Sequence, residues 1–246
     1  GTLLINRDDK FYNYLNKKGK LKKLKVVSFG KSRKSDIFPL KIVKGRVFTK
    51  LSLQVLNEKI YLEIKNINIH NVLASLAVIK VLNLNLNKIK NLFKNLEATE
   101  GRGKVHTISR YNKRFKLIDE SYNANPLSVK NAIKNFNAIK KEKFKKYLIL
   151  GDMLELGHKS KKYHTELSKV INNSNIDKVF IKGEKTLFTY KNLHKNKQGN
   201  ILQNKGDIDL VLNGLIKNND YLMIKGSNAT GLNIMSQKII KGLNVI

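Results

Sequence analysis

Beyond Gly101-Arg102-Gly103, short apolar runs alternate with amphipathic stretches, and this strand–helix rhythm continues to the end of the chain. The apolar runs predict strands at 116–119, 147–150, 178–181 and 221–224, and a weaker strand at 200–202. Helical periodicity fills the intervals and predicts helices at 126–139, 159–172, 185–191, 207–217 and 231–241. Alternation of this kind is typical of an α/β fold, in which helices cover both faces of a mostly parallel sheet.

The residues before this segment follow a different pattern. A buried strand is expected at 2–6, followed by a short helix at 8–15, and residues 25–65 are strand-like. Within that stretch, one strand face is formed by alternating residues, namely Val47, Thr49, Leu51, Leu53 and Val55. A hairpin turn is expected at Asn57-Glu58, and helices are expected at 71–82 and 86–96, the second capped by Asn85. We therefore expect two domains, 1–103 and 104–246, with the boundary at the glycine-flanked arginine.

The chain is strongly basic, with 49 Lys and Arg against 18 Asp and Glu, a formal net charge of +31. A polyanion such as nucleic acid is one interpretation, because lysines that neutralise phosphates gain affinity through counterion release. The basic residues are nevertheless spread along the whole chain, and the aromatic residues do not alternate with them as a base-stacking surface requires. A composition bias toward lysine, asparagine and isoleucine explains the charge better, so nucleic acid is the less favoured partner.

Composition also limits the compartment and the kinds of site. The absence of cysteine excludes disulfides and thiolate metal ligands. The N-terminal residues lack a signal-peptide pattern, and no apolar stretch approaches the roughly 20 residues that a membrane helix needs. A soluble cytoplasmic protein without membrane insertion is expected. The chain begins at Gly1, inside an expected strand and without a methionine, which suggests a fragment of a longer protein.

Ligands of parallel α/β sheets bind beyond the carboxyl ends of the strands, which points to the loops at 119–126, 151–157 and 225–231. In the first loop, Asp119 ends a strand, Tyr122, Asn123 and Asn125 follow, and Pro126 begins a helix. A carboxylate for ribose hydroxyls, a tyrosine for a base and amides for a peptide would make a recognition loop. The same residues would also suit a plain turn in which Asp and Asn act as caps, and spacing alone does not separate the two.

The other two loops carry charged residues as well. In the segment from Gly151 to Gly157, Asp152 can position an amine or a metal, but capping of a following helix is the simpler role for it. Lys225 and Ser227 end the last strand before a helix N-terminus, where backbone amides and an ammonium favour a carboxylate or a phosphate. A solvated loop is the alternative for this pair.

Further candidates lie before these loops. His70-Asn71 begins a helix, where the asparagine amide can bind a base edge or serve as a cap. Arg102, freed by its flanking glycines, can reach a phosphate, although a hinge is the alternative. Two patterns are rejected. Gly30-Lys31-Ser32 lacks the earlier glycine and the buried strand of a phosphate-binding loop, and His158 and His164 do not share a helix face as metal ligands would.

The ordered set of motifs resembles the Mur ligases, and among them the type that adds D-alanyl-D-alanine. The pieces that carry the resemblance are Ile5 to Asp9, His70-Asn71, Gly101-Arg102, Asp119 to Pro126, Gly151 to Gly157 with His164 downstream, and Lys225-Gly226-Ser227. The Tyr-Asn-Ala-Asn-Pro and Gly-Asp-Met-Leu-Glu-Leu-Gly segments, in this order and at this separation, are the most specific of them. The resemblance implies the C-terminal portion of a central ATP-binding domain at 1–103 and a Rossmann-like C-terminal domain at 104–246.

The resemblance also implies an activity, the ATP-dependent formation of an amide bond between UDP-N-acetylmuramoyl-tripeptide and D-alanyl-D-alanine in peptidoglycan synthesis. By resemblance, Arg102 and Lys225 are the catalytic residues, with Arg102 at the γ-phosphate. The residues implied to bind ATP are His70, Asn71, Asp119 and Tyr122. Those implied to bind the dipeptide and the developing acyl phosphate are Asn123, Asn125, Asp152 and Ser227.

Other elements of the family are expected upstream of Gly1. They are the phosphate-binding loop, the ligands of Mg²⁺ and the UDP-binding domain, so the chain alone should be inactive although ATP and Mg²⁺ are its implied cofactors. Ala74 replaces a second asparagine of the family and Asn228 an arginine, which would weaken one adenine contact and one anion contact. A monomer is expected. A sister ligase that adds another amino acid is the nearest alternative, and a basic nucleic-acid-binding protein is the more distant one.

Overall fold

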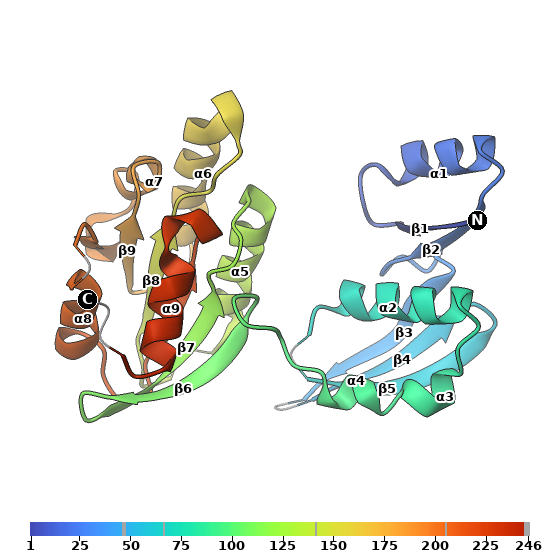
Figure 1. The fold of residues 1–246 in the computed structure, drawn as a ribbon, viewed down its shortest axis with the longest axis horizontal. Coiled ribbons are helices and arrows are strands. Elements are labelled where there is room, and N and C mark those ends of the chain that lie inside the picture. The colour runs from blue at the N-terminus through green and yellow to red at the C-terminus, as the bar shows by residue number, and fades with distance from the viewer. Residues whose placement is uncertain (46–47, 66, 141, 205, 244–246) are drawn as a thin grey trace. The chain divides into compact units, whose positions relative to one another are not determined.

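The computed structural model describes residues 1–45, 48–65, 67–140, 142–204 and 206–243. The chain divides into two compact units, Gly1–Ala98 and Thr99–Ile246. Each unit has its own sheet and its own hydrophobic core (Figure 1). Arg102 and its flanking glycines belong to the second unit, since the division falls before them.

The first unit is built on a five-stranded sheet with the order β1-β2-β3-β4-β5. Its strands are β1 (Thr2–Asn6), β2 (Lys25–Phe29), β3 (Ile37–Lys44), β4 (Thr49–Val55) and β5 (Glu58–Ile64). The first three strands pair in parallel, and β3, β4 and β5 pair as antiparallel neighbours. The strand expected at 2–6 is confirmed.

Strand β4 presents one apolar face to the core, as its alternation predicts. Leu51, Leu53 and Val55 are buried in one cluster with residues of helix α2 (Ile69–Val81), and Val47 lies outside the described residues. The hairpin turn is formed by Leu56 and Asn57, because Glu58 already begins β5. Leu56 has a φ of +53° there. The turn expected at Asn57-Glu58 is therefore wrong by one residue.

Helix α1 (Tyr12–Leu21) begins and ends later than the helix expected at 8–15. The aspartates before it are used in turns: Asp9 Oδ1 accepts the Phe11 N–H at 2.8 Å, and the Asp8 carboxylate accepts the Lys31 N–H at 2.6 Å. These contacts hold residues 8 and 9 outside the helix. The Asp9 turn is local and the Asp8 contact depends on the fold, and apolar spacing shows neither of them.

The helix expected at 86–96 is two short helices, α3 (Leu86–Ile89) and α4 (Leu92–Asn95). Leu86 and Phe93 are both buried, so helical spacing of the apolar residues persists across the break and conceals it. The predicted cap is confirmed, because the Asn85 side chain accepts the Asn87 N–H at 2.9 Å.

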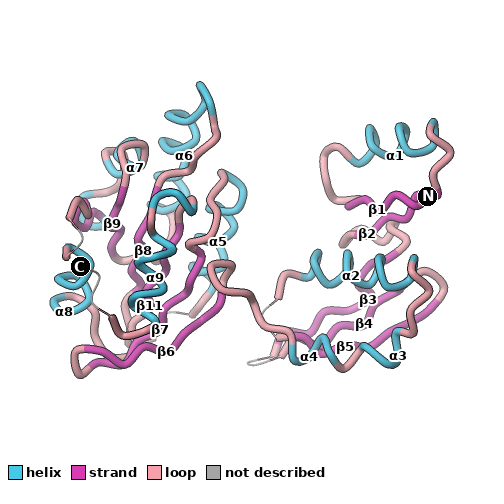
Figure 2. The backbone as a smooth tube through the Cα atoms, in the orientation of Figure 1, coloured by secondary structure: helices cyan, strands magenta, loops and turns pink. Residues whose placement is uncertain are grey.

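The second unit contains a six-stranded sheet with the order β10-β9-β8-β11-β7-β6. Its strands are β6 (Lys104–Arg110), β7 (Lys113–Glu120), β8 (Lys146–Gly151), β9 (Lys178–Lys182), β10 (Gln198–Ile201) and β11 (Tyr221–Lys225). All neighbours pair in parallel except β6, which is antiparallel to β7. The expected mostly parallel α/β sheet is confirmed. Figure 2 shows the strands of the sheet in magenta and the helices in cyan.

Strand β6 is absent from the sequence prediction. It lies at the sheet edge, and only Ile108 among its residues is buried, so it has no continuous apolar run. Tyr111 and Asn112 join it to β7 with φ values of +52° and +57°. Two successive positive φ angles are typical of a tight hairpin turn. The Tyr111-Asn112 turn between two half-polar strands was therefore the signal that the sequence prediction overlooked.

Helices cover both faces of the second sheet, as expected (Figure 1). They are α5 (Pro126–Ala138), α6 (Ser160–Asn172), α7 (Thr186–Tyr190), α8 (Asp207–Gly214) and α9 (Leu232–Ile240). Buried residues of α5 and α6 form one core with one sheet face, and those of α8 and α9 form another core with the opposite face. Among the described residues, no helix is both long enough and apolar enough to cross a membrane.

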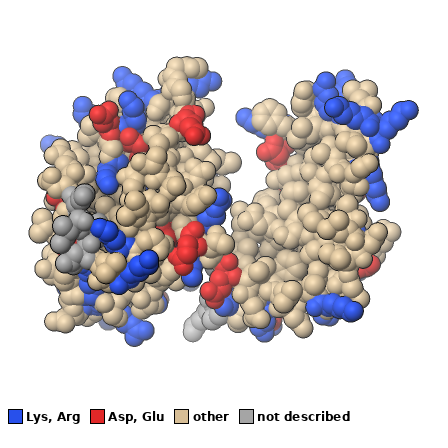
Figure 3. Space-filling view, viewed as in Figure 1, with Lys and Arg blue, Asp and Glu red and all other residues tan. Residues whose placement is uncertain are grey.

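Strands β8, β11 and β7 are adjacent and parallel. Their carboxyl ends therefore lie at the same edge of the sheet, where they are followed by the loops at 151–157, 225–231 and 119–126. The lysine and arginine side chains do not gather at one place on the face shown in Figure 3, where they lie in separate groups on both units.

Candidate active site at the edge of the second sheet

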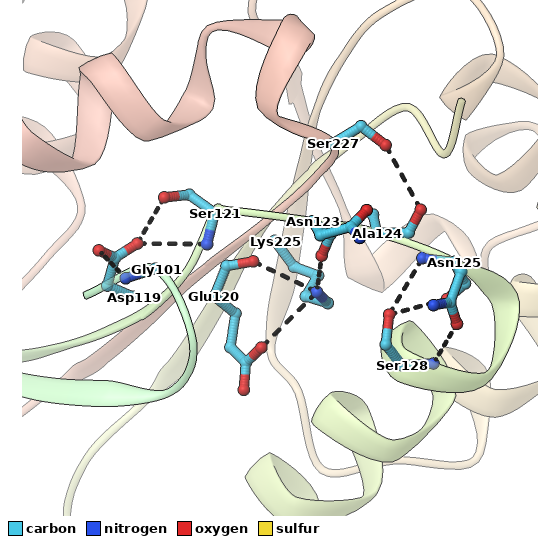
Figure 4. Close-up of polar contacts among 10 residues, drawn as sticks. All are labelled: Gly101, Asp119, Glu120, Ser121, Asn123, Ala124, Asn125, Ser128, Lys225 and Ser227. Carbon is cyan, nitrogen blue, oxygen red and sulfur yellow. Dashed lines mark hydrogen bonds and ion pairs between the residues drawn. The ribbon is translucent and has the colours of Figure 1, made fainter. Parts of the chain in front are cut away.

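Asp119, at the end of β7, is bonded within the protein. It is 1% exposed, and its Oδ2 accepts the Gly101 N–H at 2.9 Å. Its Oδ1 accepts the Ser121 hydroxyl at 2.5 Å and the Ser121 N–H at 3.2 Å (Figure 4). The carboxylate thus joins the segment at Gly101 to the turn after β7, which is a positioning role.

The glycine-flanked arginine lies beside this turn. The Gly101 carbonyl accepts the Tyr122 N–H at 3.1 Å, and the Asp119 carbonyl accepts the Gly103 N–H at 2.7 Å. The Arg102 guanidinium lies over the Tyr122 ring, 4.6 Å from its centroid. Both side chains are exposed, Tyr122 by 49%. Two residues predicted from separate motifs are thus brought together as an exposed cation–π pair.

Lys225, at the end of β11, is 2% exposed and lies behind the same loop. Its ammonium donates to the backbone carbonyls of Asn123 and Glu120, the latter at 3.3 Å, and lies 3.6 Å from Glu120 Oε2. Burial is the largest influence on both charged groups. It raises the pKa of the Glu120 carboxyl and lowers the pKa of the Lys225 ammonium, while the charge of each partner opposes the shift.

Glu120 was not among the candidate residues. Parallel pairing of β11 with β7 places Lys225 opposite Glu120, which sequence spacing does not show because the two are 105 residues apart. The sequence did contain one signal for Glu120, a second carboxylate directly after Asp119. Neighbouring residues of a strand face opposite sides of the sheet, so the two carboxylates could be expected to have different partners.

Asn125 and Asn123 have different surroundings. The Asn125 side chain caps helix α5, accepting the Ser128 N–H at 2.8 Å, while the Ser128 hydroxyl accepts the Asn125 N–H at 3.0 Å. This reciprocal pair is a capping box. The Asn123 side chain is exposed beside Tyr122. Of the two asparagines, Asn125 has a capping role, and Asn123 presents an exposed side chain beside Tyr122.

Ser227 connects all three loops. Its hydroxyl accepts the Leu154 N–H at 3.1 Å and donates to the Ala124 carbonyl at 3.4 Å. Asp152 supports the arrangement from the side: its carbonyl accepts the Ser227 N–H at 3.1 Å, and its carboxylate accepts the Thr186 N–H at 2.8 Å at the start of α7. Asp152 therefore caps amides as considered, but at the start of α7 and not at the helix that follows its own loop.

His164 is fully buried and fixes the backbone of the loop after β8. Its Nε2 accepts the Met153 N–H at 3.0 Å, so its Nδ1 carries the proton and donates to the Ser160 carbonyl at 2.9 Å. With both ring nitrogens bonded inside the protein, His164 acts as a support of the loop.

In the first unit, Asp8 joins three segments. Its carboxylate accepts the Lys31 N–H at 2.6 Å and the Ser32 N–H at 3.2 Å, and lies 2.8 Å from His70 Nε2. Burial acts to raise the pKa of Asp8, but the hydrogen bonds from Lys31, His70 and Ser32 outweigh it and hold the pKa below its ordinary value. Because Asp8 occupies these amides, Gly30-Lys31-Ser32 does not fit as a phosphate cradle, in agreement with its rejection.

Helix α2 begins beside this cluster. Asn68 is its N-cap and accepts the His70 N–H at 2.9 Å. The Asn71 side chain is exposed on the first turn and is not needed as the cap. The alternative in which Asn71 merely caps the helix is therefore wrong.

A group of three possible metal ligands, Glu100, His106 and Asp119, lies in the second unit, with ligand atoms within 4.8 Å of one another. Glu100 already pairs with Lys104 at 2.7 Å and with His106 at 3.0 Å, and Asp119 accepts its bonds from the backbone and Ser121. The neighbouring lysine ammonium disfavours a cation here, so this group is better described as a cluster of ion pairs.

Comparisons with known proteins add to this geometry. A profile of the Mur ligase, glutamate ligase domain family matches residues 101–228. The chain is 28% identical over 246 residues to a UDP-N-acetylmuramoyl-tripeptide–D-alanyl-D-alanine ligase of Buchnera aphidicola, covering 98% of this chain and 51% of that protein. The Bacillus subtilis ligase of the same name is 32% identical over 131 residues, covering 52% of this chain and 27% of that protein.

Solved structures show the same fold. The MurF structure from Acinetobacter baumannii matches with a TM-score of 0.79 and 19% identity, covering 98% of this chain and 52% of that one. A MurF ligase from Thermotoga maritima in complex with ADP matches with a TM-score of 0.76 and 19% identity, covering 98% and 54%. The chain spans about half the length of these relatives. The profile match covers more than half of the chain, contains the loops at 119–126 and 151–157, and reaches Asn228 in the third loop. The chain belongs to the Mur ligase family.

Proposed function

We propose that this chain forms the nucleotide- and acceptor-binding half of an ATP-dependent ligase that joins D-alanyl-D-alanine to UDP-N-acetylmuramoyl-tripeptide. The observation that carries the proposal is the joining of three motif loops at one sheet edge, with Arg102, Tyr122 and Asn123 exposed on it. The names of the curated relatives support the substrates, and a sheet edge of this kind is where α/β proteins bind ligands.

The reaction begins when the terminal carboxylate of the tripeptide attacks the γ-phosphoryl group of ATP, which gives an acyl phosphate and ADP. The amine of D-alanyl-D-alanine then attacks the acyl carbon, and the tetrahedral intermediate expels phosphate as the amide forms and the amine loses its proton. Negative charge accumulates on the phosphoryl oxygens and then on the oxyanion, so fixed positive groups stabilise both steps. Arg102, with its planar donors exposed, is our candidate for the phosphoryl group.

In the first unit, we assign Asn71 to an adenine edge, beside His70, which Asp8 holds in place. In the second unit, we assign Tyr122 to a face of a base or ribose, and Asp119 positions its loop through Gly101 and Ser121. For the dipeptide, we assign Asn123 as the amide donor and acceptor. Asn125 and Asp152 keep this loop in place through the caps of α5 and α7.

The proposed enzyme also requires Mg²⁺ and a phosphate-binding loop. The Gly30-Lys31-Ser32 segment does not supply that loop, because the amides of Lys31 and Ser32 are occupied by Asp8. Mg²⁺ would neutralise charge on the phosphates of ATP. The soluble substrates, ATP and a UDP-linked peptide, favour an enzyme of the cytoplasm.

The proposal is tested by phosphate release from ATP in a full-length ligase that contains this chain. Release should require the UDP-tripeptide and D-alanyl-D-alanine together, and Arg102→Ala should lower kcat by about 100-fold or more, as loss of a transition-state donor does. Lys130→Met, which removes a half-buried lysine of α5 that pairs with Glu166 at 3.3 Å, should leave the rate unchanged. Release that is independent of the dipeptide would contradict the proposal.

A further inference from the structure

The Lys225-Gly226-Ser227 motif begins at the last residue of β11. It lies behind the loop at 119–126 and not on the exposed side of that loop. Lys225 and Ser227 are 2% and 6% exposed, while Tyr122 is 49% exposed. In the close-up of Figure 4, the Lys225 ammonium points at the backbone of the loop and at Glu120. A residue that contacts a substrate needs a polar atom that the substrate can reach, and burial denies this to both side chains.

Two donors of Lys225 are used in hydrogen bonds to the loop, and the Glu120 carboxylate lies beside the ammonium as an ion-pair partner. An ammonium has three N–H groups. Three oxygens surround it, the Asn123 carbonyl, the Glu120 carbonyl at 3.3 Å and Glu120 Oε2 at 3.6 Å. A carboxylate or phosphate of a ligand would have to displace one of these oxygens, two of which belong to the backbone of the loop.

These contacts define the shape of the loop. Lys225 holds the carbonyls of residues 120 and 123, and Ser227 holds the next carbonyl, that of Ala124, while it also accepts the Leu154 N–H from the neighbouring loop. With its carbonyls turned inward toward Lys225 and Ser227, the segment presents the Tyr122 and Asn123 side chains outward.

We propose that Lys225 and Ser227 are positioning residues that hold the 120–124 loop so that Asn123 can bind the dipeptide, and that neither contacts the reacting groups. This inference rests on the proposed function for the identity of the ligand. It replaces the expectation that Lys225 is a catalytic residue. Loss of Lys225 should therefore weaken acceptor binding while leaving the chemical step of bound substrates largely intact.

The first test uses this 246-residue chain, without any activity. Amide hydrogen exchange is followed in peptides that cover residues 120–125, where the N–H groups of Ser121, Tyr122 and Asn125 are bonded. In Lys225→Met, which keeps the length of the side chain but removes the ammonium, exchange should accelerate about tenfold or more, since a charged hydrogen-bond donor is lost. Lys130→Met is the matched control and should leave these peptides unchanged. Unchanged exchange in Lys225→Met would overturn the proposal.

The second test uses the full-length ligase. Lys225→Met should raise KM for D-alanyl-D-alanine by about tenfold or more with kcat within about threefold of the unmodified enzyme, because only binding of the acceptor depends on the loop. A kcat lower by about 100-fold with KM unchanged would mean direct contact with the reacting groups and would overturn the proposal. If Lys225→Met fails to fold, Ser227→Ala gives the same two measurements, since it releases the Ala124 carbonyl without leaving a buried charge.

The two tests separate this inference from the proposed function. If the unmodified ligase shows no dipeptide-dependent turnover, the proposed function fails, and the exchange measurement still decides whether Lys225 shapes the loop.

Discussion

Gly101 shows how a single backbone position determines the geometry of the site. Its φ is +71°, and a Cβ built on it would lie 2.7 Å from the Cβ of Tyr122 and 3.1 Å from its backbone nitrogen. The residue also bonds Asp119 through its N–H and Tyr122 through its carbonyl. Close approach and a left-handed conformation together require glycine here.

Gly101→Ala should lower the free energy of unfolding by about 1–3 kcal/mol, because the new Cβ meets Tyr122 and the left-handed conformation becomes strained. The matched control is Gly214→Ala at the end of α8, where φ is negative and a Cβ would meet nothing within 4 Å. That variant should be neutral or more stable by up to about 1 kcal/mol. Urea unfolding of the chain measures both, and equal losses in the two variants would contradict the steric explanation.

The Asp8 carboxylate predicts a pH dependence. Its pKa lies below the ordinary value of 3.8, so its hydrogen bonds contribute stability above pH 3.8 and this contribution is lost as the pH falls below that value. Asp8→Asn should therefore be less stable than the unmodified chain at pH 6, and the difference should shrink as the pH falls below 3.8. Urea midpoints across this range measure it. A difference that stays constant with pH would show that the ionised form carries no special stabilisation.

At the residue scale, the sequence predicted which residue types share a loop but not which of them face a ligand. Asp119 and Glu120 are adjacent, and their different roles depend on Gly101, 18 residues away from Asp119, and on Lys225, 105 residues away from Glu120. Such long-range contacts leave no trace in local spacing. Asp119 was expected to contact ribose, and the structure instead shows its carboxylate bonded within the protein.

Two asparagines of one loop allow the structural and the ligand-binding roles to be separated. Asn125→Ala should lower the free energy of unfolding by about 1 kcal/mol, since it removes the cap of α5. Asn123→Ala removes an exposed side chain and should change stability by less than about 0.5 kcal/mol, while raising KM for the dipeptide in the full-length ligase. Thermal unfolding and kinetics measure the two effects. A larger stability loss in Asn123→Ala than in Asn125→Ala would reverse the assignment.

At the scale of elements, buried strands were predictable because parallel strands with both faces covered are continuous apolar runs. Strand β8, for which every residue is buried, is the clearest case. The edge strand β6 has one buried residue and was missed. Helix ends were the other source of error: α8 ends at Gly214 rather than at 217, because apolar spacing does not show where a helix stops.

At the scale of the whole molecule, each unit has its own core, and the second unit contains two core clusters on the two faces of its sheet. A fragment of residues 99–246 should therefore fold alone and unfold in one cooperative transition. Circular dichroism during urea unfolding measures this. A fragment without a cooperative transition would show that the second unit depends on the first.

The function could be predicted only in part from physical reasoning about the sequence. Strand–helix alternation and polar residues at the strand ends predict an α/β protein that binds ligands at one sheet edge. The side chains of the loops predict that these ligands are polar. They do not specify a dipeptide, because the same amides and hydroxyls bind many polar groups. The proposed substrate comes from the resemblance of the motifs, and the family profile shows the Mur ligase family without specifying a substrate.

The ligase activity is tested most directly by the mass of the product that the full-length protein forms from ATP, Mg²⁺, UDP-N-acetylmuramoyl-tripeptide and D-alanyl-D-alanine. We expect the UDP-linked tripeptide to gain one D-alanyl-D-alanine unit with loss of water, and only when ATP is present. An unchanged tripeptide, or a product that gains a single amino acid from a mixture of amino acids in place of the dipeptide, would contradict the proposed activity.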